Sequence, residues 1–330
     1  MEDREPLLAE DLAPEERPRR HASGYNRSTV DARELERIVD FASRVTGRAF
    51  ASRDVVAGER HGFVVVRLAN DLMAYVAKDA ASRVALATQR RVLARVGQRV
   101  TFAMPRPIGA IELEGDVDLR ERVVGATGAR FHERILRDPT LRARASAWMG
   151  ETLAELHGAL AGIELDTLGV SAPVWPHRLD RLARGIDAHL EGEASERAHA
   201  LAAAWHARAF DPRRDVYVHG DFGSHNFAFD DASGMPVGVF DFHEAGRAPR
   251  AHDLKLLPSY GDDAFAIALD RYAARAKTTL DERDVRIAHA ITALAYLAWR
   301  AEDPDAHDRG SGRDRAAAIA WANAAVHALQ

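Results

Sequence analysis

The segment from residue 219 to residue 226 contains the side chains that a phosphoryl-transfer site requires. Asp221 follows the apolar stretch 216–218, and Asn226 lies five residues later, at the start of the next apolar stretch. A carboxylate placed here can accept the proton of an attacking hydroxyl group, or hold that hydroxyl in line with the phosphate. The spacing therefore predicts Asp221 as the catalytic residue, with Asn226 close by.

A second acidic residue, Asp241, ends the apolar stretch 237–240. The turn-forming segment 230–234 joins this stretch to residues 227–229, so the two stretches form a predicted hairpin. The hairpin carries Asp241 back beside the strand that begins after Asn226. Carboxylate and amide oxygens are the hard ligands that Mg²⁺ prefers, so we predict Asn226 and Asp241 as metal ligands.

Lys78 is the third part of the predicted site. Only three of the 45 lysines and arginines in the chain are lysines, and Lys78 directly follows the apolar run 73–77. An ammonium group is a compact point charge that can lie between two phosphate oxygens, unlike the planar fork of arginine. We predict that Lys78 contacts the phosphates of a nucleotide; a solvated lysine is the alternative interpretation.

The first half of the chain contains short elements. Residues 1–24 alternate acidic residues with arginines and lack hydrophobic periodicity, which is typical of a disordered tail. Residues 25–125 are predicted to form an N-terminal lobe built on a small antiparallel sheet. The predicted elements are helices from about residue 31 and over 83–96, and strands at 63–66, 72–77, 108–113 and 119–124.

After Gly125 the pattern changes to long helices. Apolar residues recur at helical spacing over 145–160, 179–190, 265–272, 285–299 and 314–329. Three short strands interrupt them at 216–218, 227–229 and 237–240. We therefore predict an α+β protein with a lobe boundary near residue 125, in which residues 126–330 form a helical C-terminal lobe that carries the catalytic and metal motifs.

Composition removes several function classes. The chain is 47% apolar and 29% charged, with no apolar tract long enough to span a bilayer. A net charge of −5 argues against a nucleic-acid surface, and the absence of cysteine excludes disulfides and thiolate sites. No hydrophobic leader is recognisable at the N-terminus. We expect a cytoplasmic protein with neither a membrane nor a nucleic acid as partner.

The motifs around Asp221 resemble those of a known family. The run His219-Gly220-Asp221 through Asn226, followed by Phe240-Asp241-Phe242-His243-Glu244-Ala245, is similar to the aminoglycoside phosphotransferase family. The run 221–226 looks particularly like that of hygromycin B phosphotransferases. Three further segments support the resemblance: the nucleotide-lysine strand at 75–78, the interlobe hinge at 119–125, and a structural Asp-Leu pair at 253–254.

The resemblance implies a protein-kinase-like fold with two lobes and ATP- or GTP-dependent phosphorylation of a small hydroxylated compound. It also implies the roles of individual residues. Asp221 would be the catalytic base, and Asn226 and Asp241 would be the Mg²⁺ ligands. The nucleotide contacts would come from Lys78 and, in the hinge, Glu121 and Val123.

One departure from the family concerns the partner of Lys78. A glutamate on the N-lobe helix normally pairs with the nucleotide lysine in this fold, but no glutamate occurs between Asp79 and Val100. Gln89 occupies the expected position, where its amide oxygen can accept a hydrogen bond without supplying charge. Gly58 and Gly62 are candidates for a phosphate-covering loop, although two glycines more often mark an ordinary turn.

An aminoglycoside-type antibiotic is the favoured acceptor. Such a polycation would need carboxylates, and three acidic clusters are candidates, although solvated helix ends also explain them. These clusters are Glu191, Glu193 and Glu196; Asp262 and Asp263; and Glu302, Asp303, Asp305 and Asp308. Two alternatives are a metabolic kinase of the homoserine, choline, sugar or macrolide type, and a nucleotide-binding pseudokinase. A protein kinase is disfavoured because no Ala-Pro-Glu signature follows Asp241.

Overall fold

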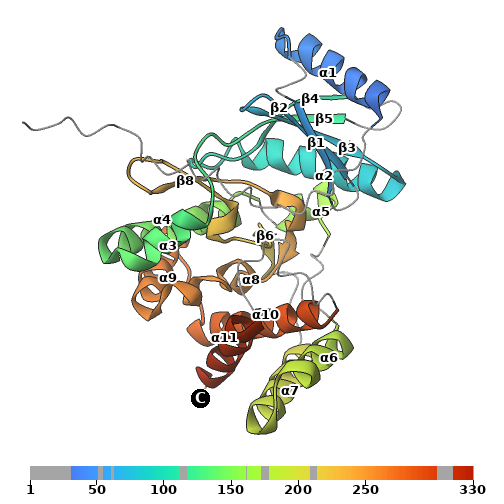
Figure 1. The fold of residues 1–330 in the computed structure, drawn as a ribbon. Coiled ribbons are helices and arrows are strands. Elements are labelled where there is room, and N and C mark those ends of the chain that lie inside the picture. Colours follow the sequence, from blue (N-terminus) through green and yellow to red (C-terminus); the bar gives the residue numbers. More distant parts are fainter. Residues whose placement is uncertain are drawn as a thin grey trace, which may run out of the picture.

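A small sheet stands above a larger helical body in the computed structural model (Figure 1). The structure describes residues 31–50, 55–60, 63–111, 117–160, 162–171, 178–208, 214–302 and 315–329. The predicted tail at residues 1–24 lies outside these ranges. Among the described residues, no helix combines the length and the apolar character needed to cross a membrane.

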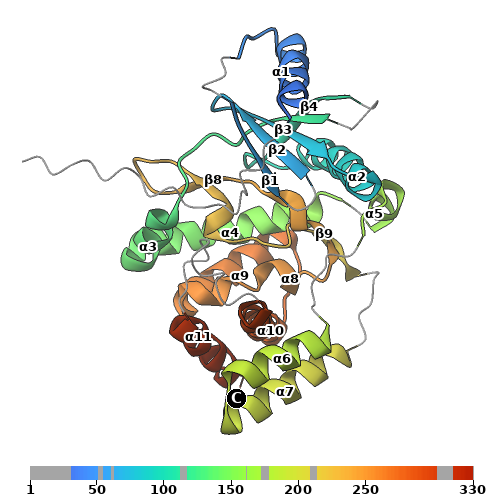
Figure 2. The ribbon, with the colours of Figure 1, turned by 45° about the vertical axis from the view of Figure 1, so that its right-hand side comes forward.

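The upper part is a five-stranded antiparallel sheet with strand order β1-β2-β3-β5-β4. Its strands are β1 (Val55–Arg60), β2 (Phe63–Leu68), β3 (Leu72–Ala77), β4 (Arg106–Ile111) and β5 (Val117–Glu121). Helices α1 (Ala32–Thr46) and α2 (Ala80–Val96) lie on opposite sides of the sheet (Figures 1 and 2). Helix α1 packs on one face through its apolar side, which includes Ile38 and Phe41.

The start of α2 is fixed by its sequence. Asp79 caps the helix by accepting a hydrogen bond from the backbone N–H of Ser82 at 2.7 Å, and the Ser82 hydroxyl in turn accepts one from the Asp79 N–H at 3.0 Å. This reciprocal pair satisfies two N–H groups that a helix end would otherwise leave unpaired. As a result α2 begins almost directly after β3, with Lys78 between the two elements.

The lower part is mostly helical. Its helices are α3 (Ala129–Arg137), α4 (Pro139–Gly158), α5 (Gly162–Leu168), α6 (Leu179–His189), α7 (Gly192–His206), α8 (Ala251–Leu254), α9 (Asp262–Ala276), α10 (Glu282–Glu302) and α11 (Arg315–His327). One apolar core joins α4 and α9 to the end of α2, and a second joins α6, α7, α10 and α11. Helices α6 and α7 lie at the end of the molecule farthest from the sheet (Figure 2).

Two short antiparallel pairs lie between these parts. Strand β6 (Val216–Val218) pairs with β9 (Gly246–Ala248), and β7 (Phe227–Phe229) pairs with β8 (Pro236–Val239). The chain segment between the lobes is bonded to the second pair, because Ala126 and Phe229 exchange two backbone hydrogen bonds of 2.8 Å. Gly238 allows close packing there, since a Cβ at this position would lie 2.5 Å from Cγ1 of Val123.

The predicted α+β, kinase-like architecture is confirmed, and every predicted helix and strand is present within a few residues of its expected bounds. The connection between the lobes runs from the end of β5 at Glu121 to the start of α3 at Ala129. Gly58 lies inside β1, opposite Val65, and therefore not in a loop; Gly62 lies outside the described residues. The sequence patterns did not predict β1, β9, α3, α5, α7 and the short helix α8.

Candidate active site

The loop that carries Asp221 is held by a buried carboxylate. Asp253 on α8 is fully buried and accepts the backbone N–H groups of His219 and Gly220, both at 2.7 Å. Since the two bonds use different carboxylate oxygens, the peptide groups that end at His219 and at Gly220 have a fixed orientation. The Asp-Leu pair at residues 253 and 254 thus has the structural role that the resemblance implied.

Asp253 stays ionised despite its burial. Burial alone would raise the pKa of this carboxyl group, but the hydrogen bond and charge of His157 outweigh it and lower the pKa to about 2. His157 contacts Asp253 at 3.1 Å through Nε2, and its Nδ1 lies 2.8 Å from the hydroxyl of Tyr272. The loop is therefore connected through Asp253 to α4, which carries His157, and to α9, which carries Tyr272.

Replacing Asp253 with asparagine should strongly destabilise the fold. Asparagine can accept only one of the two backbone N–H groups and leaves the other buried without a partner. Disrupting a buried, hydrogen-bonded charge costs about 3–5 kcal/mol, which urea unfolding at pH 7 would measure. Asp263→Asn, which changes an exposed ion pair with Arg142, is the matched control and should barely move the midpoint.

The acid sensitivity of the fold offers a second readout for Asp253. Its pKa is lowered from the ordinary aspartate range to about 2, so its stabilising effect is complete above about pH 4 and is lost as the pH falls towards 2. Asp253→Asn should lack this part of the acid unfolding profile. An identical acid profile in the variant would contradict the assignment.

His219 supports the loop from inside. Its ring is buried; Nδ1 accepts the backbone N–H of Asp221 at 3.2 Å, and Nε2 donates to the carbonyl oxygen of Phe240 at 2.9 Å. Burial lowers the pKa of His219, which favours the neutral ring that these two bonds require. The histidine links the segment before Asp221 to the segment before Asp241.

The side chain of Asp221 is engaged on one oxygen. Its Oδ2 lies 2.9 Å from Nε2 of His225 and accepts a hydrogen bond of 2.9 Å from Nδ2 of Asn226. Burial would raise the pKa of Asp221, but the hydrogen bond and charge of His225 outweigh it and hold the pKa below its usual range. Asp221 is therefore a carboxylate at neutral pH.

Asn226 is oriented by the same contacts. Its Nδ2 also donates to the backbone carbonyl of Asp221 at 2.9 Å, so both hydrogens of the amide nitrogen are used within the loop. This leaves the amide oxygen, Oδ1, as the atom available to a cation. Asn226 and Asp221 are thus brought together as the spacing predicted.

Asp241 follows β8 in a left-handed backbone conformation, with φ 68° and ψ 58°. A residue other than glycine adopts this conformation at a cost, which is often found at functional sites. Its Oδ1 lies 2.7 Å from Nδ1 of His243. The residue before Asp241, Phe240, donates its backbone N–H to the carbonyl of Asn226 at 2.9 Å, so Asp241 lies next to the loop that carries Asp221 and Asn226.

The donor atoms of this region fit a magnesium ion. Among the residues that the structure describes, no group of three or more histidines, aspartates and glutamates could hold a metal alone. Two protein ligands suffice for Mg²⁺, which usually completes its shell with phosphate oxygens and water. The carboxylate of Asp241 and the amide oxygen of Asn226 are donors of the right kind.

The predicted nucleotide residues lie around the junction of sheet and helices. Lys78 is exposed at the end of β3. Gln89 on α2 donates from its side-chain nitrogen to the carbonyl of Phe242, directly after Asp241. Gln89 therefore connects α2 to the metal segment, and its pairing with Lys78 stays a prediction.

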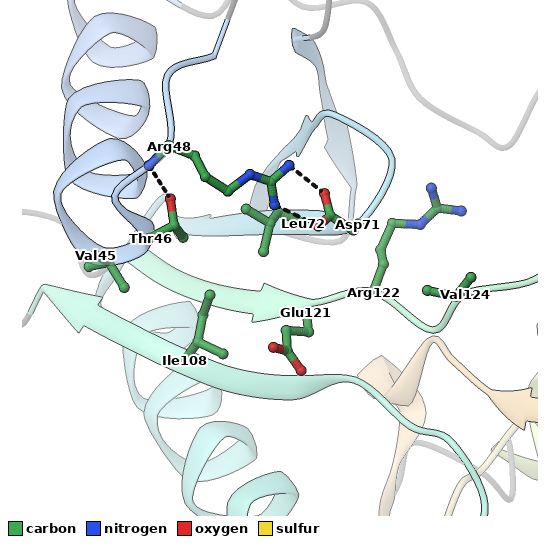
Figure 3. Close-up of a pocket in the computed structure, with 9 residues that line it drawn as sticks. All are labelled: Val45, Thr46, Arg48, Asp71, Leu72, Ile108, Glu121, Arg122 and Val124. Carbon is green, nitrogen blue, oxygen red and sulfur yellow. Dashed lines mark hydrogen bonds and ion pairs between the residues drawn. The ribbon is translucent and has the colours of Figure 1, made fainter.

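The two hinge residues face different surroundings. Val123 is buried against β8. Glu121 lines a hollow between the end of α1 and the strands β3, β4 and β5, where Arg48 pairs with Asp71 at 2.6 Å (Figure 3). None of the residues that line this hollow belongs to the loop of Asp221 or Asp241, so the nucleotide contacts of Glu121 and Val123 also stay predictions.

Three polar residues of the site were not singled out from the sequence. His225 and His243 each contact one of the predicted site carboxylates, and Lys255 contacts the loop from below. The sequence signal for His225 was its position directly before Asn226. Lys255 had the same signal as Lys78, namely its rarity among many arginines.

An antiparallel sheet above a helical body, with Asp221 and Asp241 on neighbouring loops, is the architecture of protein-kinase-like phosphotransferases. The chain belongs to the phosphotransferase enzyme family, whose model matches residues 55–288. Such enzymes transfer a phosphate to a hydroxyl group of a small molecule. A search of curated protein sequences returned no match.

Solved structures agree with this fold. The GDP complex of wild-type aminoglycoside 2'-phosphotransferase-IIIa has a TM-score of 0.65 at 13% identity, covering 89% of this chain and 99% of that chain. Macrolide 2'-phosphotransferase MphH from Brachybacterium faecium has a TM-score of 0.58 at 18% identity, covering 86% and 98%. Aminoglycoside phosphotransferase APH(3'')-Id from Streptomyces rimosus has a TM-score of 0.51 at 19% identity, covering 81% and 99%.

Proposed function

We propose that this protein transfers the terminal phosphate of ATP or GTP to a hydroxyl group of a small molecule, with Mg²⁺ as the metal. The observation that carries the proposal is that Asp221 and Asn226 are hydrogen-bonded in one loop, to which the segment just before Asp241 is bonded through Phe240. Little covalent chemistry is needed in such a transfer, because positioning and charge neutralisation do most of the work.

In this mechanism Asp221 holds the acceptor. Its Oδ2 is occupied by His225 and Asn226, so Oδ1 is the atom that accepts the hydrogen bond from the attacking hydroxyl. Asn226 and Asp241 would hold Mg²⁺, which would supply positive charge to offset that of the phosphates. Lys78 contacts the phosphates from the upper lobe, and the hinge at Glu121 and Val123 binds the base.

An aminoglycoside-type antibiotic is the first candidate acceptor. Two of the similar structures are aminoglycoside phosphotransferases by their descriptions. Glu244, three residues after Asp241, fits this class, because its side chain is 53% exposed and its contact with Nε2 of His243 is long, at 3.5 Å. An ammonium group of the acceptor could pair with it.

A less charged acceptor, such as a macrolide or a metabolic alcohol, is the second candidate. The observation that favours it is that the acidic clusters named above are partly neutralised by ion pairs. Four of their members already pair with arginines: Asp262 with Arg286, Asp263 with Arg142, Glu302 with Arg181, and Glu193 with Arg197. Carboxylates neutralised in this way have less to offer a polycation.

A coupled assay of ADP or GDP release separates these candidates. The purified protein with Mg²⁺ and either nucleotide would be tested against aminoglycosides, macrolides, amino alcohols and sugars. Release stimulated by one class identifies the acceptor. Nucleotide binding without stimulation by any acceptor would instead support a pseudokinase and would overturn the proposal.

A further inference from the structure

Lys255 is a buried lysine directly below the loop of Asp221. It follows α8, and only 5% of its surface is exposed. Its Nζ donates to the carbonyl oxygen of Gly220 and lies 3.0 Å from Nε2 of His252. The carbonyl of Gly220 belongs to the peptide bond that joins Gly220 to Asp221, so this contact acts on the backbone of the proposed catalytic residue.

The backbone of this loop is therefore held at its N–H groups and at a carbonyl group. Asp253 accepts the N–H groups of His219 and Gly220, and Lys255 donates to the carbonyl of Gly220. The two holding residues are separated by one position on the same short segment. Asp253 holds the two peptide groups before Gly220. The Gly220–Asp221 peptide itself is held by Lys255 at its carbonyl and by Nδ1 of His219 at its N–H.

The surroundings of Gly220 leave little freedom for another arrangement. Its φ is +88°, and a Cβ at this position would lie 2.2 Å from the carbonyl oxygen of Glu244. The loop thus packs directly on the segment after Asp241. The buried carbonyl of Gly220 needs a hydrogen-bond donor, because an unpaired buried carbonyl costs free energy of folding. Lys255 supplies that donor.

Lys255 is itself fixed by contacts at its main chain. Its carbonyl oxygen lies 2.6 Å from Nδ1 of His289 on α10, and Nε2 of His289 accepts a hydrogen bond of 3.0 Å from Trp321 on α11. A series of bonds therefore runs from the C-terminal helix to the loop of Asp221. A lysine on such an anchored backbone can hold the loop rigidly.

The charge of Lys255 also reaches the site. Burial lowers the pKa of Lys255 below its ordinary value, although the charges of Asp221, Asp253 and Glu244 act in the opposite direction. A positive charge here is favoured by these carboxylates. A charged donor also forms a stronger hydrogen bond to the Gly220 carbonyl than a neutral one would.

We propose that Lys255 is a positioning residue for phosphoryl transfer, which orients the Gly220–Asp221 peptide and so aims the carboxylate of Asp221 at the acceptor hydroxyl. The inference rests on the proposed function of Asp221. It assigns to one of the three lysines of the chain a role in turnover that is separate from nucleotide binding.

The test compares Lys255→Met with Lys255→Arg in the full-length protein. Methionine has a similar length without charge or donor, whereas arginine keeps both. Lys277→Met is the control, since Lys277 directly follows α9 and is exposed. Amide hydrogen exchange at His219, Gly220 and Asp221 reports the loop directly, and circular dichroism reports the fold.

We expect Lys255→Met to speed exchange at these three amides by at least about 10-fold. With the acceptor found in the screen, kcat should fall by roughly 10- to 100-fold, while the KM for nucleotide stays within about twofold. Lys255→Arg should keep most of the exchange protection and most of the kcat. Lys277→Met should match the wild-type protein in both.

Two results would overturn the inference. One is unchanged exchange and kcat in Lys255→Met. The other is an equal loss of exchange protection, nucleotide binding and melting temperature in both Lys255 variants, which would indicate packing alone. If the unchanged protein phosphorylates none of the acceptors, the proposed function fails, whereas the exchange data still decide whether Lys255 orders the loop.

Discussion

Asp221→Ala should lower turnover by roughly 10²- to 10⁴-fold and leave nucleotide affinity nearly unchanged. The carboxylate is the group that meets the acceptor hydroxyl, and its low pKa keeps it ionised at neutral pH. Its removal takes away a contact that matters in the transition state and not one that binds the nucleotide. Steady-state assays with the acceptor, together with calorimetric titration of the nucleotide, measure the two effects separately.

The control for Asp221→Ala is Asp231→Ala. Asp231 lies in the turn between β7 and β8, its side chain is 71% exposed, and it pairs with Arg130. This variant should keep full turnover. Asp221→Asn is a useful companion, because it keeps the size of the side chain and removes only the charge. Full activity in either Asp221 variant would remove this residue from the mechanism.

Asp241→Ala should abolish the part of nucleotide binding that depends on Mg²⁺. The carboxylate is the only charged ligand among the two predicted ones, and loss of contacts that support a metal typically costs about 10- to 100-fold in metal affinity. In the presence of Mg²⁺, the nucleotide affinity of the variant should be as low as that of the wild-type protein measured in EDTA. Calorimetric titration with and without the metal measures this difference.

Backbone strain at Asp241 calls for a second variant. Asparagine tolerates the left-handed conformation well, so Asp241→Asn separates loss of charge from any change in the backbone. Asp187→Ala, at an exposed pair with His199, is the control and should bind as the unchanged protein does. Unchanged Mg²⁺-dependent binding in both Asp241 variants would reject the role of Asp241.

Local patterns were enough to predict most of the fold. Runs of β-branched residues with a turn between them gave β2 and β3, and apolar spacing gave α4 and α10. The strand β1 was not predicted because Gly58 and the polar residues after it interrupt the apolar run. A strand at the edge of a sheet also needs fewer apolar side chains than a central one. Helix α7 escaped because its glutamates were interpreted as a solvated acidic cluster.

The candidate site was predictable for a different reason. The order of Asp221, Asn226 and Asp241 along the chain determines which loops they occupy. The pairing of β7 with β8 then brings the loop of Asp241 next to that of Asn226. The contacts of His225, His243 and Lys255 could not be predicted in this way. They depend on which side chains from separate segments meet at the loop, and one sequence does not contain that information.

The unequal exposure of the lysines has a practical consequence for chemical labelling. An acylating reagent that attacks free amines would find Lys78 accessible at the surface and Lys255 shielded by its buried surroundings. With so few amines in the chain, mass spectrometry of the labelled protein would give a simple map. Protection of Lys78 by a bound nucleotide would then be visible as the loss of a single modified peptide.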